Sequence, residues 1–141
     1  MYIGEYNHTI DTKGRLIVPV KFREQLGDKF VVTKGLDGCL SLYDLKAWNV
    51  LEEKLSSLPM TNPSARKLSR FMLAGASECE LDKMGRILIP QVLRSAASLE
   101  KDVVLVGVGT KIEIWDKNKW TEANSYDDMS EIAESLEGFG I

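Results

Sequence analysis

Short runs of alternating apolar and polar residues, bounded by glycine or proline, predict a chain of strands joined by tight turns and short helices. The β-branched runs RLIVP and RILIP each follow a glycine, Gly14 or Gly85, which is typical of the second strand of a β-hairpin. Pro19 and Pro90 end these runs and precede the short helical sequences VKFREQL and QVLRSAASL. Six further strands are expected, at residues 4–10, 29–33, 39–43, 75–81, 102–106 and 111–115.

Helical spacing of apolar residues appears after each group of strands. Asp44 is placed to cap a helix that runs to about residue 58, and Asn62 followed by Pro63 should begin a second helix. These two helices lie between the groups of strands and should link them. Asp116 should begin a short helix over residues 117–124, and the acidic end of the chain is expected as a frayed helix.

The sequence repeats itself at an offset of 71 residues. DTKGRLIVP at residues 11–19 aligns with DKMGRILIP at residues 82–90. Further on, residues 30–48 resemble residues 103–120 once one residue is skipped. Because each copy is too small to bury its apolar faces alone, the two copies should share a single core.

These patterns predict an α+β fold in which two tandem β-hairpin units interleave into one small barrel with pseudo-two-fold symmetry, covered by peripheral helices. Two copies are too few for a solenoid, which favours this pseudo-symmetric arrangement. The expected organisation is a first unit with its C-terminal helix at residues 1–60, a linking helix at 61–74, a second unit at 75–124 and an acidic tail at 125–141.

The charge of the chain is unevenly distributed. The formal net charge is −3, yet residues 1–71 carry 11 Lys and Arg against 8 Asp and Glu, and residues 72–141 carry 7 against 13. Because only the local potential acts on a nearby phosphate, an acidic tail is compatible with a basic face elsewhere. No apolar run is long enough to predict a membrane span, and the N-terminus lacks the pattern of a signal peptide.

Neither a metal site nor a catalytic site is predicted. Cys39 and Cys79 form no C-x-x-C pair and have no zinc-ligand spacing with His8, so both are expected as buried free thiols. No nucleophile–base arrangement, phosphate-binding loop or pair of carboxylates stands out, and the tryptophans fall at matched repeat positions that favour core packing. We therefore expect no cofactor, no metal, no small-molecule substrate and no enzymatic activity.

The repeated turn itself offers a chemistry. Its Asp can accept backbone N–H bonds, its Gly reverses the chain, and its Arg leaves the turn on a rigid strand with five donors in a planar fork. Such a fork suits a phosphate or the O6/N7 edge of guanine. A paired β-ribbon reader of DNA would then make contact through Thr12, Lys13, Arg15, Lys83 and Arg86, on turns built by Asp11, Gly14, Asp82 and Gly85.

Other interpretations of the same residues stay open. Each Asp could simply pair with the Arg of its own turn, which would make the arginine a structural device. Arg23 and its repeat partner Arg94, with Lys21 and Glu5, are weaker candidates, and the three cations are expected to face water rather than phosphates. The basic turns could also bind an acidic protein partner, which salt-dependent retention on a DNA column would distinguish. A barrel enzyme is disfavoured because a catalytic set is lacking.

Two D-x-x-G-R motifs at this offset, each followed by aliphatic residues and proline, resemble the MraZ family. These are bacterial regulators of the division and cell-wall gene cluster, related to the AbrB, SpoVT and MazE swapped-hairpin DNA-binding domains. The opening GEYNHTIDTKGRLIVPVKFREQLG looks like an MraZ N-terminus, and the resemblance extends to Asn124. The second turn departs from the pattern, because Met84 stands where the first turn has Lys13, and Lys83 where it has Thr12.

The resemblance implies that one chain holds two AbrB-like half-units and that the D-x-x-G-R hairpins form the DNA-contacting surface. It also implies a ring-shaped homo-oligomer that binds short direct repeats upstream of its own operon and usually represses it. The corresponding location is the cytoplasm, in association with the nucleoid. The departure at the second turn implies a weaker or different DNA contact there.

Overall fold

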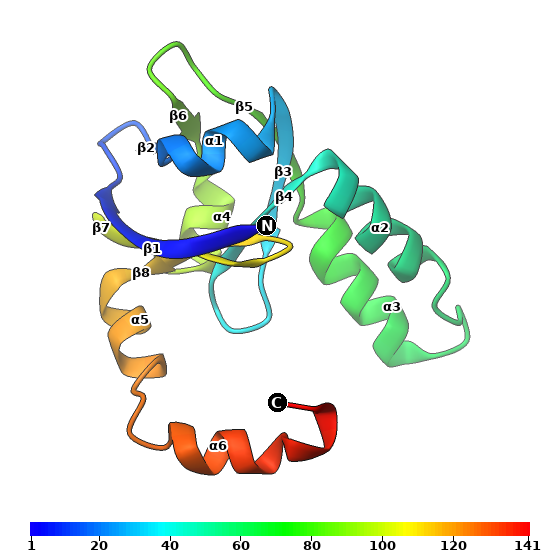
Figure 1. Ribbon diagram of the computed structural model, residues 1–141. Coiled ribbons are helices and arrows are strands. Elements are labelled where there is room, and N and C mark those ends of the chain that lie inside the picture. The colour runs from blue at the N-terminus through cyan, green and yellow to red at the C-terminus, as the bar shows by residue number, and fades with distance from the viewer.

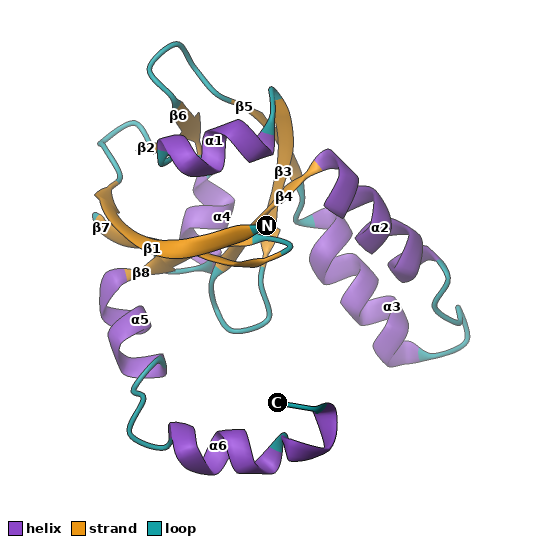
Figure 2. Cartoon of the chain, in the orientation of Figure 1, coloured by secondary structure: helices purple, strands orange, loops and turns teal.

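Two antiparallel sheets organise the chain in the computed structural model, which describes residues 1–141 (Figure 1). The larger sheet has six strands in the order β1-β7-β8-β4-β3-β5, and the smaller sheet pairs β2 with β6. The strands are β1 (Tyr2–Thr9), β2 (Arg15–Ile17), β3 (Lys29–Lys34), β4 (Leu40–Asp44), β5 (Ser77–Glu80), β6 (Arg86–Leu88), β7 (Asp102–Gly109) and β8 (Ile112–Asp116). The predicted strands are all present, and the α+β class is confirmed (Figure 2).

The two halves of the chain are interleaved through their strands. β1 pairs with β7, β2 with β6, β3 with β5 and β4 with β8, so four of the six ladders join the first half to the second. Only the β3–β4 and β7–β8 pairs lie within one half. Neither half could therefore keep its sheet without the other.

The predicted hairpins around Gly14 and Gly85 are wrong in their strand pairing. Between β1 and β2 only one bridge forms, from Ile10 to Leu16, and β2 forms its ladder with β6 instead. Both strands are only three residues long, too short for a stable hairpin, whereas pairing across the halves sets Leu16 opposite Ile87 over the core. The pair of strands β2 and β6 is called the ribbon below.

The predicted closed barrel is not confirmed. β1 and β5 are the two edges of the larger sheet, and no ladder joins them. β5 has only four residues before the chain enters the second D-x-x-G-R turn, which limits the pairing available at that edge. The architecture is an open six-stranded sheet with a separate two-stranded ribbon.

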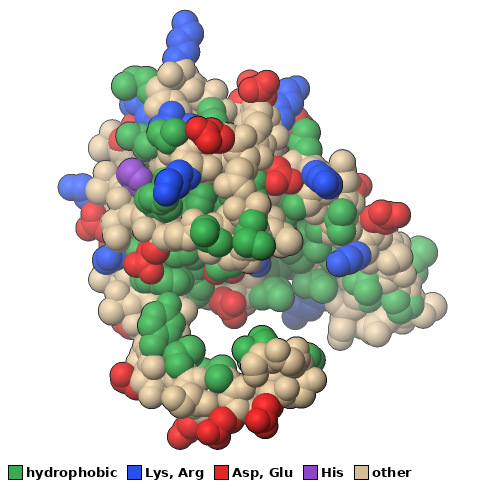
Figure 3. Space-filling view, in the orientation of Figure 1, with side chains coloured by type: hydrophobic (Ala, Val, Ile, Leu, Met, Phe, Trp, Pro, Cys, Tyr) green, Lys and Arg blue, Asp and Glu red, His purple; other side chains and the backbone are tan.

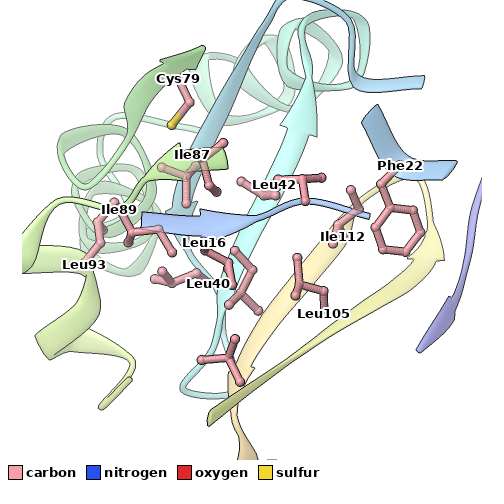
Figure 4. Close-up of a cluster of buried hydrophobic side chains, with 14 of the residues drawn as sticks. Leu16, Phe22, Leu40, Leu42, Cys79, Ile87, Ile89, Leu93, Leu105 and Ile112 are labelled. Atoms are coloured by element: carbon pink, nitrogen blue, oxygen red, sulfur yellow. The ribbon is translucent and has the colours of Figure 1, made fainter. Parts of the chain in front are cut away.

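One hydrophobic core serves both halves (Figure 4). Its 20 buried residues come from both sheets, from the short helices α1 (Val20–Leu26) and α4 (Gln91–Ala96), and from the segments that connect them. Leu16 and Ile87 enter it from the ribbon, Phe22 enters it from α1, and Leu42 and Ile112 enter it from central strands; all five are fully buried. The ribbon is thus attached to the larger sheet by apolar side chains from both of its strands.

Six α-helices are present, and the first five begin where the sequence predicts. They are α1 (Val20–Leu26), α2 (Leu45–Ser56), α3 (Pro63–Ser69), α4 (Gln91–Ala96), α5 (Lys117–Ala123) and α6 (Met129–Ser135). Asp44, Asn62 and Asp116 accept hydrogen bonds from the first-turn N–H groups of α2, α3 and α5, as expected of N-caps. No helix combines the length and the apolar character needed to cross a bilayer.

Two helical appendages flank the sheets. α2 and α3 form a helical hairpin on one side, and α3 continues as a π-helical turn, Arg70–Ala74, where Met72 O accepts a 2.6 Å bond from the buried Thr33 hydroxyl. On the other side, residues 125–141, called the tail arm below, contain α6 and a 3-10 turn at Glu137–Phe139. Helix is therefore present in the acidic end, as expected. Figure 3 shows the arm as a separate lobe with acidic side chains along its outer edge.

The shared core predicts that one ribbon residue controls the stability of the whole chain. Leu16→Ala should lower the free energy of unfolding by about 2–5 kcal/mol, because Leu16 is fully buried. Ile17→Ala, one residue along the same strand but 42% exposed, should cost much less. Denaturant unfolding followed by tryptophan fluorescence should show one transition that shifts as a unit. A second transition unaffected by Leu16→Ala would contradict a common core.

Candidate nucleic-acid interface

The first D-x-x-G-R turn is held by its own aspartate. Oδ1 of Asp11 accepts the backbone N–H groups of Lys13 and Arg15, both at 2.9 Å, and Oδ2 accepts Nε–H of Arg15 at 2.6 Å. Main-chain bonds of 3.0 Å from Gly14 to Asp11 and from Asp11 to Arg15 close the turn. Gly14 has φ of +83°, in the region that favours glycine. One carboxylate therefore fixes both the backbone and the arginine side chain.

The second turn repeats this geometry. Asp82 accepts the backbone N–H groups of Met84 and Arg86 at 2.9 Å and Nε–H of Arg86 at 2.8 Å. The backbone N–H of the arginine is the largest cause that lowers the pKa of Asp11 and of Asp82 below the ordinary value. Desolvation opposes it, and the hydrogen bond from the guanidinium lowers the pKa further by a smaller amount. Both carboxylates, ionised at neutral pH like any ordinary aspartate, hold their turns, and the lowered pKa extends the charged state toward lower pH.

Each arginine uses only part of its donor set in this arrangement. Nε bonds to the carboxylate, whereas no hydrogen bond within the chain involves the terminal nitrogens of Arg15 or Arg86. The two side chains are 33% and 23% exposed. The ion pair within each turn is thus real, and it orients a guanidinium whose remaining donors are still available.

The strand register places both arginines on one face of the ribbon. Arg15 lies opposite Leu88, and Arg86 lies opposite Ile17, while the residue between them in each strand is buried in the core. Ile17 is 42% and Leu88 62% exposed. The outer face of the ribbon therefore combines two oriented guanidinium groups with two uncovered aliphatic side chains.

Arg23 and Arg94 brace the turns across the two halves. The guanidinium of Arg94 lies against Gly14, and that of Arg23 lies against Gly85, so closely that a Cβ on either glycine would overlap it. Nε of Arg23 donates to Val18 O at 2.7 Å, whereas Nε of Arg94 is buried without a partner. The expectation that these two arginines simply face water is wrong, because both are half-buried against the opposite turn. In the sequence, the signal for a shared role was that Arg23 and Arg94 occupy matching positions in the two repeats.

The tips of both turns are open to solvent. Thr12, Lys13 and Lys83 are exposed, and none of their side chains takes part in a hydrogen bond or ion pair within the chain. Figure 1 shows both turn loops projecting at the same end of the molecule. Met84, 67% exposed, occupies the second tip where the first has a lysine, so the two tips differ in charge placement.

Other reactive side chains lie away from this surface. Cys39 and Cys79 are free and buried, as predicted, and burial raises their pKa values to about 12 and about 11. His8 lies in β1. No three His, Cys, Asp or Glu side chains gather as a metal site would require.

Comparison with known proteins reproduces the repeat. The sequence model of a family described as "MraZ protein, putative antitoxin-like" matches residues 1–71 and again residues 72–139. The chain belongs to the MraZ family. Relatives named transcriptional regulator MraZ occur in Caldanaerobacter subterraneus subsp. tengcongensis and Clostridium acetobutylicum, each 57% identical over the full length of both chains. Another, from Lachnoclostridium phytofermentans, is 57% identical over all of this chain and 99% of its own.

Each matched segment of this MraZ-family chain contains one D-x-x-G-R turn and one bracing arginine. The arginine of one segment packs on the turn of the other, in both directions. The candidate surface is therefore assembled only when the two family segments are interleaved.

Because Arg94 packs on Gly14 and Arg23 packs on Gly85, a packing called the brace here, glycines with the same positive φ should differ in the stability lost on substitution by alanine. Gly38→Ala should cost about 1–2 kcal/mol from its φ of +80° alone, because the only neighbour of an added Cβ is Lys119 Nζ at 3.9 Å. Gly14→Ala and Gly85→Ala should cost more, because the methyl group also displaces Arg94 or Arg23. Thermal or denaturant unfolding measures the difference. Equal losses at all three positions would show that the brace contributes nothing.

The turn geometry also predicts how the stability contributed by Asp11 depends on pH. Folding stability from Asp11 should be present above its unfolded pKa of about 3.9 and should be lost as pH falls through the lower folded value. Arg15→Ala should raise the folded pKa of Asp11 only partway, because the backbone N–H of residue 15, the largest cause of the shift, is retained. Carboxyl NMR titration tests this, and a full return to the ordinary value would contradict it.

Proposed function

We propose that this chain is a sequence-specific DNA-binding transcriptional regulator that contacts DNA through the outer face of the ribbon and the tips of its two turns. In line with the family resemblance, it represses the division and cell-wall gene cluster that contains its own operon. It acts in the cytoplasm, on the nucleoid, as a non-enzymatic protein without a cofactor. The contact residues are Thr12, Lys13, Arg15, Lys83 and Arg86.

The observation that carries this proposal is the way in which Asp11 holds Arg15 and Asp82 holds Arg86, an arrangement called the clasp below. Each guanidinium is held by a carboxylate through Nε, on one face of a rigid ribbon, with its terminal nitrogens free. A fork held in this way presents donors in a fixed direction, as bidentate recognition of guanine or phosphate needs. Pre-organisation of this kind reduces the entropy lost on binding.

The lysines at the tips and the arginines of the clasp suit different parts of DNA. Because each arginine is paired with an aspartate, much of the unbalanced positive charge at this end comes from Lys13 and Lys83 at the tips and from the bracing arginines. The lysines suit phosphates, which position a protein without reading sequence, whereas the clasped arginines suit base edges. The exposed Ile17 and Leu88 add apolar surface suited to thymine methyl groups or sugars.

One chain alone is a modest DNA binder. Four cations at the turns, Lys13, Arg15, Lys83 and Arg86, correspond to a salt slope of about −4 at most. A ring of such chains on short direct repeats would gain roughly 10²–10⁴ in avidity over a single contact. We therefore propose a ring-shaped homo-oligomer on repeated promoter boxes, with the tip that carries Met84 making the weaker contact.

Substitution of the clasped arginines tests this proposal. Arg15→Ala and Arg86→Ala should each cost about 1–3 kcal/mol of discrimination between matched and mismatched duplexes. Arg15→Lys with Arg86→Lys should keep most of the salt slope but lose discrimination, because an ammonium lacks the fork. Lys29→Ala, an exposed change on β3, is the matched control and should change neither. Binding is measured by mobility shift at two salt concentrations.

The folded state of each variant is checked by its unfolding transition. Full affinity and an unchanged salt slope in a folded Arg15→Ala/Arg86→Ala variant would contradict the proposal. If that variant unfolds, the two lysine substitutions decide, since discrimination retained with lysine at both positions would assign the arginines a structural role only.

A further inference from the structure

The tail arm carries an apolar stripe without a packing partner. Met129 and Ile132 on α6 and Leu136, which directly follows the helix, are at helical spacing and are 41%, 39% and 39% exposed, and Phe139 beyond them is 80% exposed. Among the helices and strands, α6 makes its main contacts with the 3-10 turn that follows it. Figure 3 shows hydrophobic side chains on the inner side of the arm, facing open space. An amphipathic helix with this stripe uncovered calls for an apolar surface.

The residues around this apolar stripe are acidic. The chain from Glu122 to its end holds six acidic residues and no basic one. Asp128 directly precedes α6 and Glu137 directly follows Leu136, so these two acids stand at the ends of the stripe. Within α6, at about 100° per residue, Glu131 and Glu134 lie on the side opposite Met129 and Ile132. None of these carboxylates takes part in an ion pair within the chain. The complementary surface should have an apolar floor and a basic rim.

The helical hairpin formed by α2 and α3 has that composition. Between the two helices lies a groove of about 330 Å³, with the exposed Arg66, Arg70 and Met60 at its border and the more buried Leu55, Leu58 and Leu73 as its apolar floor. Residues 57–77 contain Arg66, Lys67 and Arg70 but no acidic residue, and no salt bridge within the chain uses any of the three cations.

We propose that the tail arm of one copy docks in the α2–α3 groove of a second copy of the same chain. Ile132 and Leu136 contact the apolar floor, and the flanking carboxylates lie beside Arg66 and Arg70, as in recognition of an amphipathic helix by a groove. This surface deepens the assembly part of the proposed function and does not depend on DNA binding.

The geometry of a single chain favours a second copy as the partner. Figure 1 shows α6 separated from α2 and α3, and α5, from which the arm departs, is anchored on the sheet with Trp120 against Trp115 at 5.5 Å between ring centroids. Each copy offers one arm and one groove on different surfaces, so the contact is head-to-tail. Such a contact gives a closed ring when the rotation between successive copies closes, which is the assembly proposed above.

Cysteine cross-linking between two differently tagged full-length chains tests the contact directly. One chain carries Ala133→Cys on α6 and the other carries Ser69→Cys in the groove. Mild oxidation should give a disulfide-linked heterodimer at roughly ten times the yield obtained when Ser95→Cys, exposed on α4, replaces Ser69→Cys. The native thiols are buried, which keeps them out of the reaction. Equal yields with both partners would overturn the proposal.

A charge exchange distinguishes docking between copies from docking within one. Asp128→Lys/Glu137→Lys in the arm, or Arg66→Glu/Arg70→Glu in the groove, should each weaken association at least roughly tenfold in sedimentation velocity, and mixing the two variants should restore it. Glu131→Lys/Glu134→Lys changes the same charge on the outer side of α6 and should have a clearly smaller effect. No loss in either variant, an equal loss in the control, or no recovery on mixing would overturn the proposal. Binding to a single-site duplex, measured in parallel, reports separately on the ribbon.

Discussion

In each turn, one carboxylate accepts two backbone N–H groups and a guanidinium, and the candidate surface depends on this convergence. The bonds of Asp11 and Asp82 measure 2.6–2.9 Å, and they lower the pKa of both carboxyls. If the carboxylate only neutralised the arginine, the turn would be purely structural. Because the bond uses Nε, the terminal nitrogens remain free, and a structural ion pair also fixes the direction of a guanidinium with donors to spare.

The duplication explains why this arrangement occurs twice on one rigid surface. Val18 N–H donates to Gly85 O and Ile89 N–H donates to Gly14 O, both at 3.0 Å, so each turn is hydrogen-bonded to the strand end of the other half. Arg23 and Arg94 repeat the exchange with their side chains. Any change that separates the halves should therefore dismantle both turns together. The ribbon therefore links the stability of the fold to the geometry of the candidate surface.

Local signals predicted local structure well. Asp44, Asn62 and Asp116 cap helices as expected, since capping depends on neighbouring residues alone. The D-x-x-G-R repeat indicated the geometry of the two turns because its residues bond to one another within five positions, whereas their role in binding DNA stays a prediction. Strand pairing was mistaken, because whether β2 pairs with β1 or with β6 is decided by distant partners and burial. The positions of Arg23 and Arg94 were noticed, but their packing on the opposite turn follows only from the interleaved topology.

The most direct test of the central claim is a structure of the chain bound to a duplex that carries the proposed direct-repeat boxes. The account predicts the terminal nitrogens of Arg15 and Arg86 at hydrogen-bonding distance from guanine O6/N7 or phosphate oxygens, with each Nε still bonded to Asp11 or Asp82. DNA held by another face, or guanidinium groups that contact only their own carboxylates while the duplex is bound, would contradict it.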